Sequence, residues 1–167
     1  MFTGAAVVMG VSSSGKTLIG EGVARRLGVP FIEGDSLHAP ESIAKMSAGI
    51  PLTDDDRWPW LERIGKALAG PGGQIAACSA LKRSYRDAIA RAAGRPLAFV
   101  LLRGDRPLLE QRIRNRSGHF MPPSLLDSQL ATLEEPGPDE TSIILDIADT
   151  PEQLIDQTCK FLLGLPV

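Results

Sequence analysis

The sequence predicts a three-layer α/β/α domain with a five-stranded parallel β-sheet at its centre. Five short apolar runs alternate along the chain with longer segments of helical periodicity. Strands that are apolar on both faces indicate a parallel sheet covered by helices on both sides. A length of 167 residues fits a single domain, residues 1–167, without a linker. The predicted strands are AAVVM (5–9), VPFIE (29–33), QIAAC (74–78), PLAFVLL (96–102) and SIILDI (142–147).

The composition is that of a globular protein and argues against several kinds of partner. The net charge of −2 supplies no basic field for a phosphate backbone, so we expect no nucleic-acid partner. The amino-terminal stretch MFTGAAVVMG lacks the basic region of a signal peptide, and no run approaches the ~18 apolar residues of a membrane span. The two cysteines, Cys78 and Cys159, have no metal-ligand spacing and are expected to be buried apolar side chains. We therefore expect a cytoplasmic protein that binds small molecules.

The first predicted strand leads directly into a phosphate-binding loop. Residues 10–17, GVSSSGKT, fit the pattern G-x-x-x-x-G-K-[ST], and a helical pattern follows over 16–27. In this context backbone N–H groups and the helix N-terminus bind phosphates, Lys16 lies near the β and γ phosphates, and Thr17 places its hydroxyl on Mg²⁺. A serine-rich helix cap is the alternative. The predicted nucleotide-binding residues of the loop are Gly10, Ser12, Ser13, Ser14, Gly15, Lys16 and Thr17.

Other features narrow the kind of P-loop protein. A GTPase would also carry an NKxD-type base-reading motif and a DxxG switch, and the sequence has neither. A motor-type ATPase usually ends its third strand in an acidic residue, whereas this third strand runs into Ser79 and Ala80. Of the common functions of P-loop proteins, the transfer of a phosphoryl group from ATP to a small molecule is the one that remains.

Three further blocks stand out in the sequence: EGDSLHAPESIAKMSAGIPLTDDDRWPWL, CSALKRSYRD and RSGHFMPPSLLDSQLATLEEPGPDE. Together with GVSSSGKT they closely resemble the gluconokinase family, the small P-loop enzymes that phosphorylate D-gluconate with ATP. The resemblance covers residues 5 to about 150. It implies a P-loop kinase fold like that of shikimate and nucleoside monophosphate kinases, a sheet order of 2-3-1-4-5, a mobile lid and a homodimer.

The irregular stretch 34–60 has the chemistry expected of a binding site for a sugar acid. Gluconate offers one carboxylate and five hydroxyls, so its site needs a cation for the first and acceptors for the rest. A nucleoside monophosphate would instead call for clustered arginines. The stretch contains five candidate acceptors and two cations: Asp35, His38, Asp54, Asp55 and Asp56, and Lys45 and Arg57.

Each of three residues in this stretch has a predicted role. Asp35 follows a strand beside the P-loop, where ligands bind in open α/β sheets, and is predicted to orient the attacking hydroxyl and accept its proton. A purely binding or metal-shell role is its alternative. His38 is a candidate hydroxyl contact or a structural hydrogen bond. Arg57 can pair bidentately with the gluconate carboxylate; its alternative is a surface ion pair with a neighbouring aspartate.

The run LTDDDRWPW, residues 52–60, indicates a helix N-terminus. One aspartate would cap the helix and the others would be favoured by its dipole. Trp58 and Trp60 are interpreted as packing residues, with sugar stacking as the alternative. A dedicated metal site is the weakest interpretation, because consecutive side chains on a helix diverge.

Basic residues complete the predicted site. Lys82 follows the third strand and is a predicted substrate-binding residue that could reach either the substrate or the transferring phosphoryl group. Arg86 lies four residues later on the same helical face, so one of the pair should serve the site and the other the helix surface. Arg112 and Arg116 lead into a predicted lid, about 112–124, that closes over the ATP phosphates; a solvated basic face is the alternative.

The predicted reaction is ATP plus D-gluconate giving 6-phosphogluconate and ADP. Lys16, Asp35 and Arg116 are the predicted catalytic residues, with Mg²⁺ as a cofactor. Two alternatives stay open: a shikimate-type kinase acting on another small hydroxy acid, and a nucleotide-binding regulatory module with little catalysis.

Overall fold

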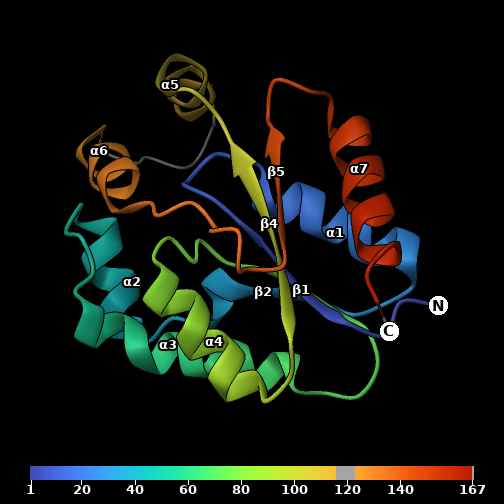
Figure 1. Ribbon diagram of the computed structural model, residues 1–167. Helices are drawn as coiled ribbons and strands as arrows, with labels where there is room; N and C mark the ends of the chain where they lie inside the picture. Colours follow the sequence, from blue (N-terminus) through green and yellow to red (C-terminus); the bar gives the residue numbers. More distant parts are fainter. Residues whose placement is uncertain (116–122, 167) are drawn as a thin grey trace.

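The computed structural model describes residues 1–115 and 123–166 and has a five-stranded parallel sheet between two layers of helices (Figure 1). The strand order is β2-β3-β1-β4-β5, as the resemblance implied. Each predicted strand is present within two residues of its expected bounds. The strands are β1 (Ala5–Met9), β2 (Phe31–Glu33), β3 (Gln74–Ala77), β4 (Leu97–Arg103) and β5 (Ser142–Asp146).

Helices cover both faces of the sheet. On one face α1 (Lys16–Leu27) packs with α7 (Pro151–Leu163), and on the other α3 (Asp54–Leu68) packs with α4 (Arg83–Ala93) (Figure 1). The 3₁₀ turn η1 (Gly34–Leu37) and α2 (Pro40–Ser47) follow β2, while α5 (Arg106–Arg114) and α6 (Pro123–Thr132) follow β4. None of the helices in the described part of the chain is long and apolar enough to cross a bilayer.

Local sequence signals explain where the helices begin and end. Thr53 caps α3 and Thr150 caps α7, and each forms a capping box with the third residue of its helix. Helix α1 ends at Gly28, whose φ of 68° is favourable only for a residue without a Cβ.

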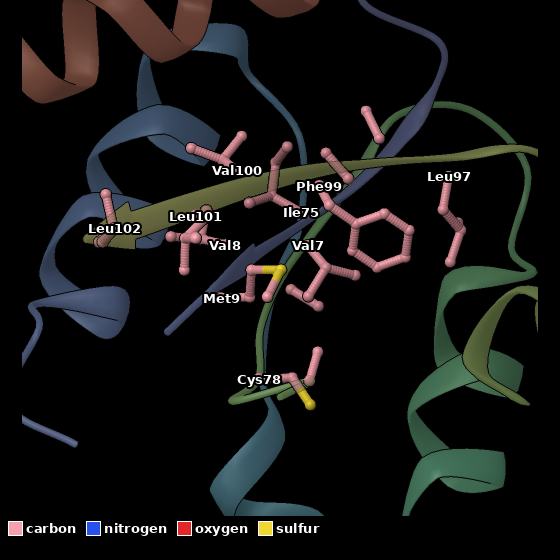
Figure 2. Close-up of a cluster of buried hydrophobic side chains, with 14 of the residues drawn as sticks. Val7, Val8, Met9, Ile75, Cys78, Leu97, Phe99, Val100, Leu101 and Leu102 are labelled. Atoms are coloured by element: carbon pink, nitrogen blue, oxygen red, sulfur yellow. The ribbon is translucent and has the colours of Figure 1, made fainter. Parts of the chain in front are cut away.

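The core lies around the central strand β1, all of whose residues are buried. Figure 2 shows Val7 and Val8 among side chains from the neighbouring strands, including Ile75 and Val100. These four residues have no exposed surface. Burying each of them contributes about 1.5–3 kcal/mol relative to leaving it in water, so this part of the sheet is a rigid support for the loops at its carboxyl edge.

Glycine at position 65 sets the close packing of α3 against α4. A Cβ there would lie 2.5 Å from both the Cβ of Ala92 and the carbonyl oxygen of Ile89. Any side chain would therefore push the two helices apart. Their contact brings the first turns of α3 and α4 together, which decides the geometry of the site described below.

Both cysteines are free and buried, as expected. Burial raises the pKa of the Cys78 thiol to about 12, so this thiol stays protonated near neutral pH.

Candidate active site

The loop between β1 and α1 has the backbone shape of a phosphate cradle. Gly10, Ser13 and Gly15 have positive φ angles of 148°, 64° and 94°. A Cβ at Gly10 would lie 2.8 Å from the Ser14 Oγ and 2.9 Å from the carbonyl oxygen of Leu102, so only glycine fits. The loop leads into the N-terminus of α1, whose free N–H groups favour anions.

A pocket of about 500 Å³ lies over this loop. Two predicted site residues from elsewhere in the sequence line it, Asp35 from η1 and Arg112 from α5. The structure thus brings a carboxylate and a guanidinium to the phosphate loop, as phosphoryl transfer requires. The other lining residues are Ser12, Ser13, Gly15, Lys16, Thr17, Leu18 and Glu21.

Side chains within this pocket are joined by hydrogen bonds. Lys16 donates from Nζ to the carbonyl oxygen of Val11 at 2.8 Å, which folds it over the loop. Thr17 donates from its hydroxyl to Glu33, and the other Glu33 oxygen accepts from the backbone N–H of Asp35 at 3.3 Å. Glu33 therefore connects the first turn of α1 to the turn that carries Asp35.

The P-loop also contacts helix α6. The backbone N–H of Ser12 donates to the Gln129 Oε1 at 2.6 Å.

Arg112 lies on α5 and donates to the carbonyl oxygen of Ile147 at 2.7 Å. Arg116 and most of the predicted lid fall in 116–122, outside the described residues, so the roles predicted for them stay predictions.

A second polar group forms where α3 and α4 meet. The Tyr85 hydroxyl donates to Asp54 Oδ1 and accepts from Arg57 Nη1 at 3.0 Å. The same Asp54 oxygen lies 3.8 Å from Arg57 Nη1 and 3.7 Å from Lys82 Nζ. We call Asp54, Arg57, Lys82 and Tyr85 the α3–α4 cluster. It contains both cations predicted to contact the substrate, and it also contains the Arg57–Asp54 pair that was the alternative.

The electrostatics of the cluster follow from these contacts. The hydrogen bond from Tyr85 lowers the pKa of the Asp54 carboxyl, with Lys82 and Arg57 contributing. Burial, followed by the hydrogen bond to Asp54, raises the pKa of Tyr85 to about 12. Asp54 is therefore ionised and Tyr85 neutral near pH 7, which leaves two positive charges against one negative charge.

His38 and Trp60 pack together beside the turn that carries Asp35. Their rings stack at 4.0 Å between centroids, and Trp60 Nε1 donates to the carbonyl oxygen of Gly34 at 2.8 Å, directly before Asp35. The pKa of His38 is lowered, chiefly by burial. Asp35 opposes this shift, and the positive charges of Arg63 and Arg57 add to it. His38 Nδ1 is buried without a hydrogen-bond partner in the described part of the chain. Trp60 is a packing residue here.

Two expectations about these helices are wrong. Thr53, not an aspartate, caps α3; Asp56 completes the capping box and pairs with Lys45 at 2.8 Å. Arg86 does not lie on the helix surface: it is 1% exposed and pairs with Glu140. The first was wrong because a threonine side chain can accept from the N2 or N3 amide as an aspartate does. The second was wrong because the loop that carries Glu140 covers Arg86, and the helical periodicity of α4 does not reveal that contact.

Arg86 nevertheless supports the site. Its Nη1 donates to the carbonyl oxygen of Ala80 at 2.9 Å, and Ala80 has a φ of 46°, which costs energy for a residue with a Cβ. Glu140 holds the same guanidinium from the other side at 2.7 Å and 3.2 Å. This buried pair therefore holds the loop that delivers Lys82 to the α3–α4 cluster.

Among the side chains that form hydrogen bonds in the site, Glu33, Tyr85 and Gln129 were not predicted. Glu33 ends a strand two residues before Asp35, so its position at the carboxyl edge of the sheet was a usable signal. Tyr85 and Gln129 meet partners 31 and 117 residues away in the chain, and no local pattern indicates such contacts.

Comparisons with known proteins agree with this geometry. Residues 6–136 match the family model described as an AAA domain. The gluconokinase of Gluconobacter oxydans (strain 621H) is 46% identical over 158 residues, covering 92% of this chain and 88% of that protein. The thermosensitive gluconokinase of Escherichia coli (strain K12) is 47% identical over 157 residues, covering 88% and 83%.

A solved structure extends the similarity to three dimensions. The crystal structure of a gluconokinase from Sinorhizobium meliloti 1021 superposes with a TM-score of 0.90 at 51% identity, covering 97% of this chain and 93% of that one. With a phosphate cradle, a facing carboxylate and this degree of likeness along nearly the whole chain, the protein belongs to the gluconokinase family.

Proposed function

We propose that the protein phosphorylates D-gluconate, with ATP as the donor, to give 6-phosphogluconate and ADP. The observation that carries the proposal is the pocket in which Asp35 faces the P-loop residues Lys16 and Thr17. The gluconokinases that match this chain over most of its length support the choice of acceptor. The alternative of a shikimate-type kinase has no comparable support.

The positions of the residues around the pocket support the roles proposed for them. Asp35 orients the terminal hydroxyl of gluconate and accepts its proton as the hydroxyl oxygen bonds to the γ phosphorus. The bond from that phosphorus to the bridging oxygen breaks, and ADP leaves. Lys16, the P-loop amides and Arg112 stabilise the negative charge on the phosphoryl oxygens during the transfer.

The residues present also fit Mg²⁺, which prefers hard oxygen ligands and keeps several waters. The Thr17 hydroxyl and the Glu33 carboxylate are joined by a hydrogen bond, and Asp35 lines the same pocket. Thr17 would hold the ion directly, with the two carboxylates close by. When bound, the ion neutralises charge on the phosphates.

At the other end of the substrate, the gluconate carboxylate binds Arg57 and Lys82 in the α3–α4 cluster. Arg57 is mostly covered, and Tyr85 orients it. A planar guanidinium can form two parallel hydrogen bonds to a carboxylate, which a lysine cannot. His38, which stacks on Trp60 near Asp35, is the proposed contact for a hydroxyl along the sugar chain.

Three further proposals concern the domain organisation, the cellular location and the oligomeric state of the protein. Residues 1–167 form one kinase domain, with a substrate-binding insertion at about 34–60 and a lid at about 112–124. The protein works in the cytoplasm. It forms a homodimer, which light scattering at micromolar concentration tests directly.

The deciding experiment is a coupled assay of ADP release with D-gluconate, other sugar acids, shikimate and nucleoside monophosphates as acceptors. D-gluconate should give the largest kcat/KM. Lys16→Ala should lower kcat on the order of a hundredfold to a thousandfold, as expected for a donor that acts on developing charge. Thermal unfolding should be unchanged. A Lys16→Ala protein that folds normally and turns over like the wild type would refute the mechanism.

A further inference from the structure

The donors of the α3–α4 cluster are built to hold a carboxylate, and a carboxylate of the protein already sits among them. Three donors, from Tyr85, Arg57 and Lys82, converge on one oxygen of Asp54. These are the groups proposed above to receive the carboxylate of gluconate, so this inference rests on the proposed function.

Two of the donors, Tyr85 and Arg57, are covered by the protein, whereas the acceptor is half exposed. Tyr85 is 2% exposed, and the Arg57 side chain is 18% exposed and held by the Tyr85 hydroxyl. The Asp54 side chain is 46% exposed and belongs to the first residue of α3, at the surface. It can turn into water while Arg57 and Tyr85 stay in place.

The contacts of Asp54 with the two cations are also loose. At 3.8 and 3.7 Å they exceed the roughly 2.7–2.9 Å of charge-assisted hydrogen bonds. Both cations lie near the face of Tyr85, at 5.3 and 5.4 Å from its ring centroid. Two positive charges face one negative charge, so the cluster has the charge and the donors to bind a substrate carboxylate more closely than it binds Asp54.

We propose that Asp54 is an internal stand-in for the substrate carboxylate. It occupies the subsite formed by Arg57, Lys82 and Tyr85 in the unliganded protein, and gluconate displaces it. Asp54 thereby keeps the donors correctly arranged and the cations partly neutralised between turnovers. It also competes with the substrate, which lowers the affinity for gluconate.

The test is a calorimetric titration of D-gluconate into wild-type protein and Asp54→Asn, in the presence of a non-hydrolysable ATP analogue. Partly exposed ion pairs are weak, so removing the competing charge should tighten gluconate binding about two- to fivefold. Binding of D-sorbitol, which has a hydroxyl in place of the carboxylate, should not change.

Asp55→Asn is the matched control, because it removes the same charge from the next residue of the same helix turn. Asp55 is exposed and forms no ion pair within residues 1–115 and 123–166. It should leave gluconate affinity unchanged. Asp54→Ser, which also removes the carboxylate, checks the result if the asparagine variant unfolds early.

The outcomes separate the two hypotheses. If wild-type protein fails to bind gluconate, the proposed function is wrong. If wild-type protein binds gluconate but Asp54→Asn binds it equally or more weakly, Asp54 is not a competitor and only this inference falls. An equal gain for Asp55→Asn, or for sorbitol, would also overturn it, because the effect would then not belong to a carboxylate at this subsite.

Discussion

Two arginines on the facing helices α4 and α3 differ in how fully groups of the protein satisfy them, and only Arg57 is proposed to bind substrate. Arg86 is 1% exposed, and its Nε and Nη2 reach the two oxygens of Glu140 at 2.7 and 3.2 Å. Arg57 is 18% exposed and lies 3.8 Å from Asp54. Each has one carboxylate close by, yet only the first pair has closed, bidentate geometry.

The difference lies in what remains for a ligand. The guanidinium of Arg86 is saturated by Glu140 and by the carbonyl oxygens of Ala80 and Leu81. Burial raises the pKa of Glu140, but its hydrogen bonds with Arg86 and Gly137 and the nearby positive charges outweigh this and leave the pKa below its usual value. Arg57 instead has only a long contact with Asp54, whose carboxylate also accepts from Tyr85 and lies near Lys82. A saturated pair stabilises the fold, whereas an unsaturated one can bind substrate.

The largest effect should come from breaking the buried ion pair of Arg86 and Glu140, which should lower stability. Arg86→Ala leaves Glu140 buried without its partner and frees the strained loop at Ala80, so the free energy of unfolding should fall by about 3–5 kcal/mol. Urea denaturation measures this. Arg91→Ala, an exposed position on the same helix, is the control and should change stability little. A loss below about 1 kcal/mol for Arg86→Ala would show that the pair is not a structural support.

Removing the Arg57 guanidinium from the α3–α4 cluster should instead weaken the binding of gluconate. Arg57→Ala removes a charge-assisted bidentate contact and should cost about 1.5–3 kcal/mol, roughly a tenfold to hundredfold loss of gluconate affinity. Arg57→Lys should recover only part of it, because an ammonium keeps the charge and loses the planar fork. Titration of gluconate beside a non-hydrolysable ATP analogue gives the affinities.

Lys66→Ala, an exposed residue of the same helix, should bind gluconate normally. If Arg57→Ala also binds gluconate normally, the contrast between the two arginines fails, and Arg57 reverts to the surface ion pair that its neighbour Asp54 would provide.

The smallest effect concerns acid stability at the start of α3. The hydrogen bond with Lys45, followed by those with Thr53, lowers the pKa of Asp56 to about 2. A carboxyl with a lowered pKa stabilises the fold at pH values above its unfolded pKa of about 4, and this contribution is lost as the pH falls from there towards 2. Asp56→Asn should therefore flatten the decline of stability over that interval.

Urea midpoints measured between pH 2.5 and 7 test this, with Asp55→Asn as the control. Asp55 has no ion-pair partner to lose in the described part of the chain, so its variant should retain the wild-type slope while changing stability by about 0.5 kcal/mol or less through the helix dipole. Equal slopes for wild type and Asp56→Asn would mean that the capping box and the Lys45 pair do not respond to acid.

Sequence by itself determined the parts of this protein whose geometry is encoded within a few residues. The loop GVSSSGKT needs left-handed backbone angles at particular positions, and glycine supplies two of them. The strands follow from short apolar runs, and Asp35 from its place just after one of them. Each of these signals arises from backbone conformation or burial over a short segment, so each can be recognised in the sequence without knowledge of the tertiary structure.

Only the tertiary structure decided which charges meet. The contact of α3 with α4 at Gly65 brings Tyr85 to Asp54, and a loop 54 residues away supplies Glu140 to Arg86. Sequence spacing placed Lys82 and Arg86 on one helix face but could not say which would be buried. The energy of an ion pair depends on its distance, its burial and what else competes for it, and these are properties of packed surfaces that no single segment contains.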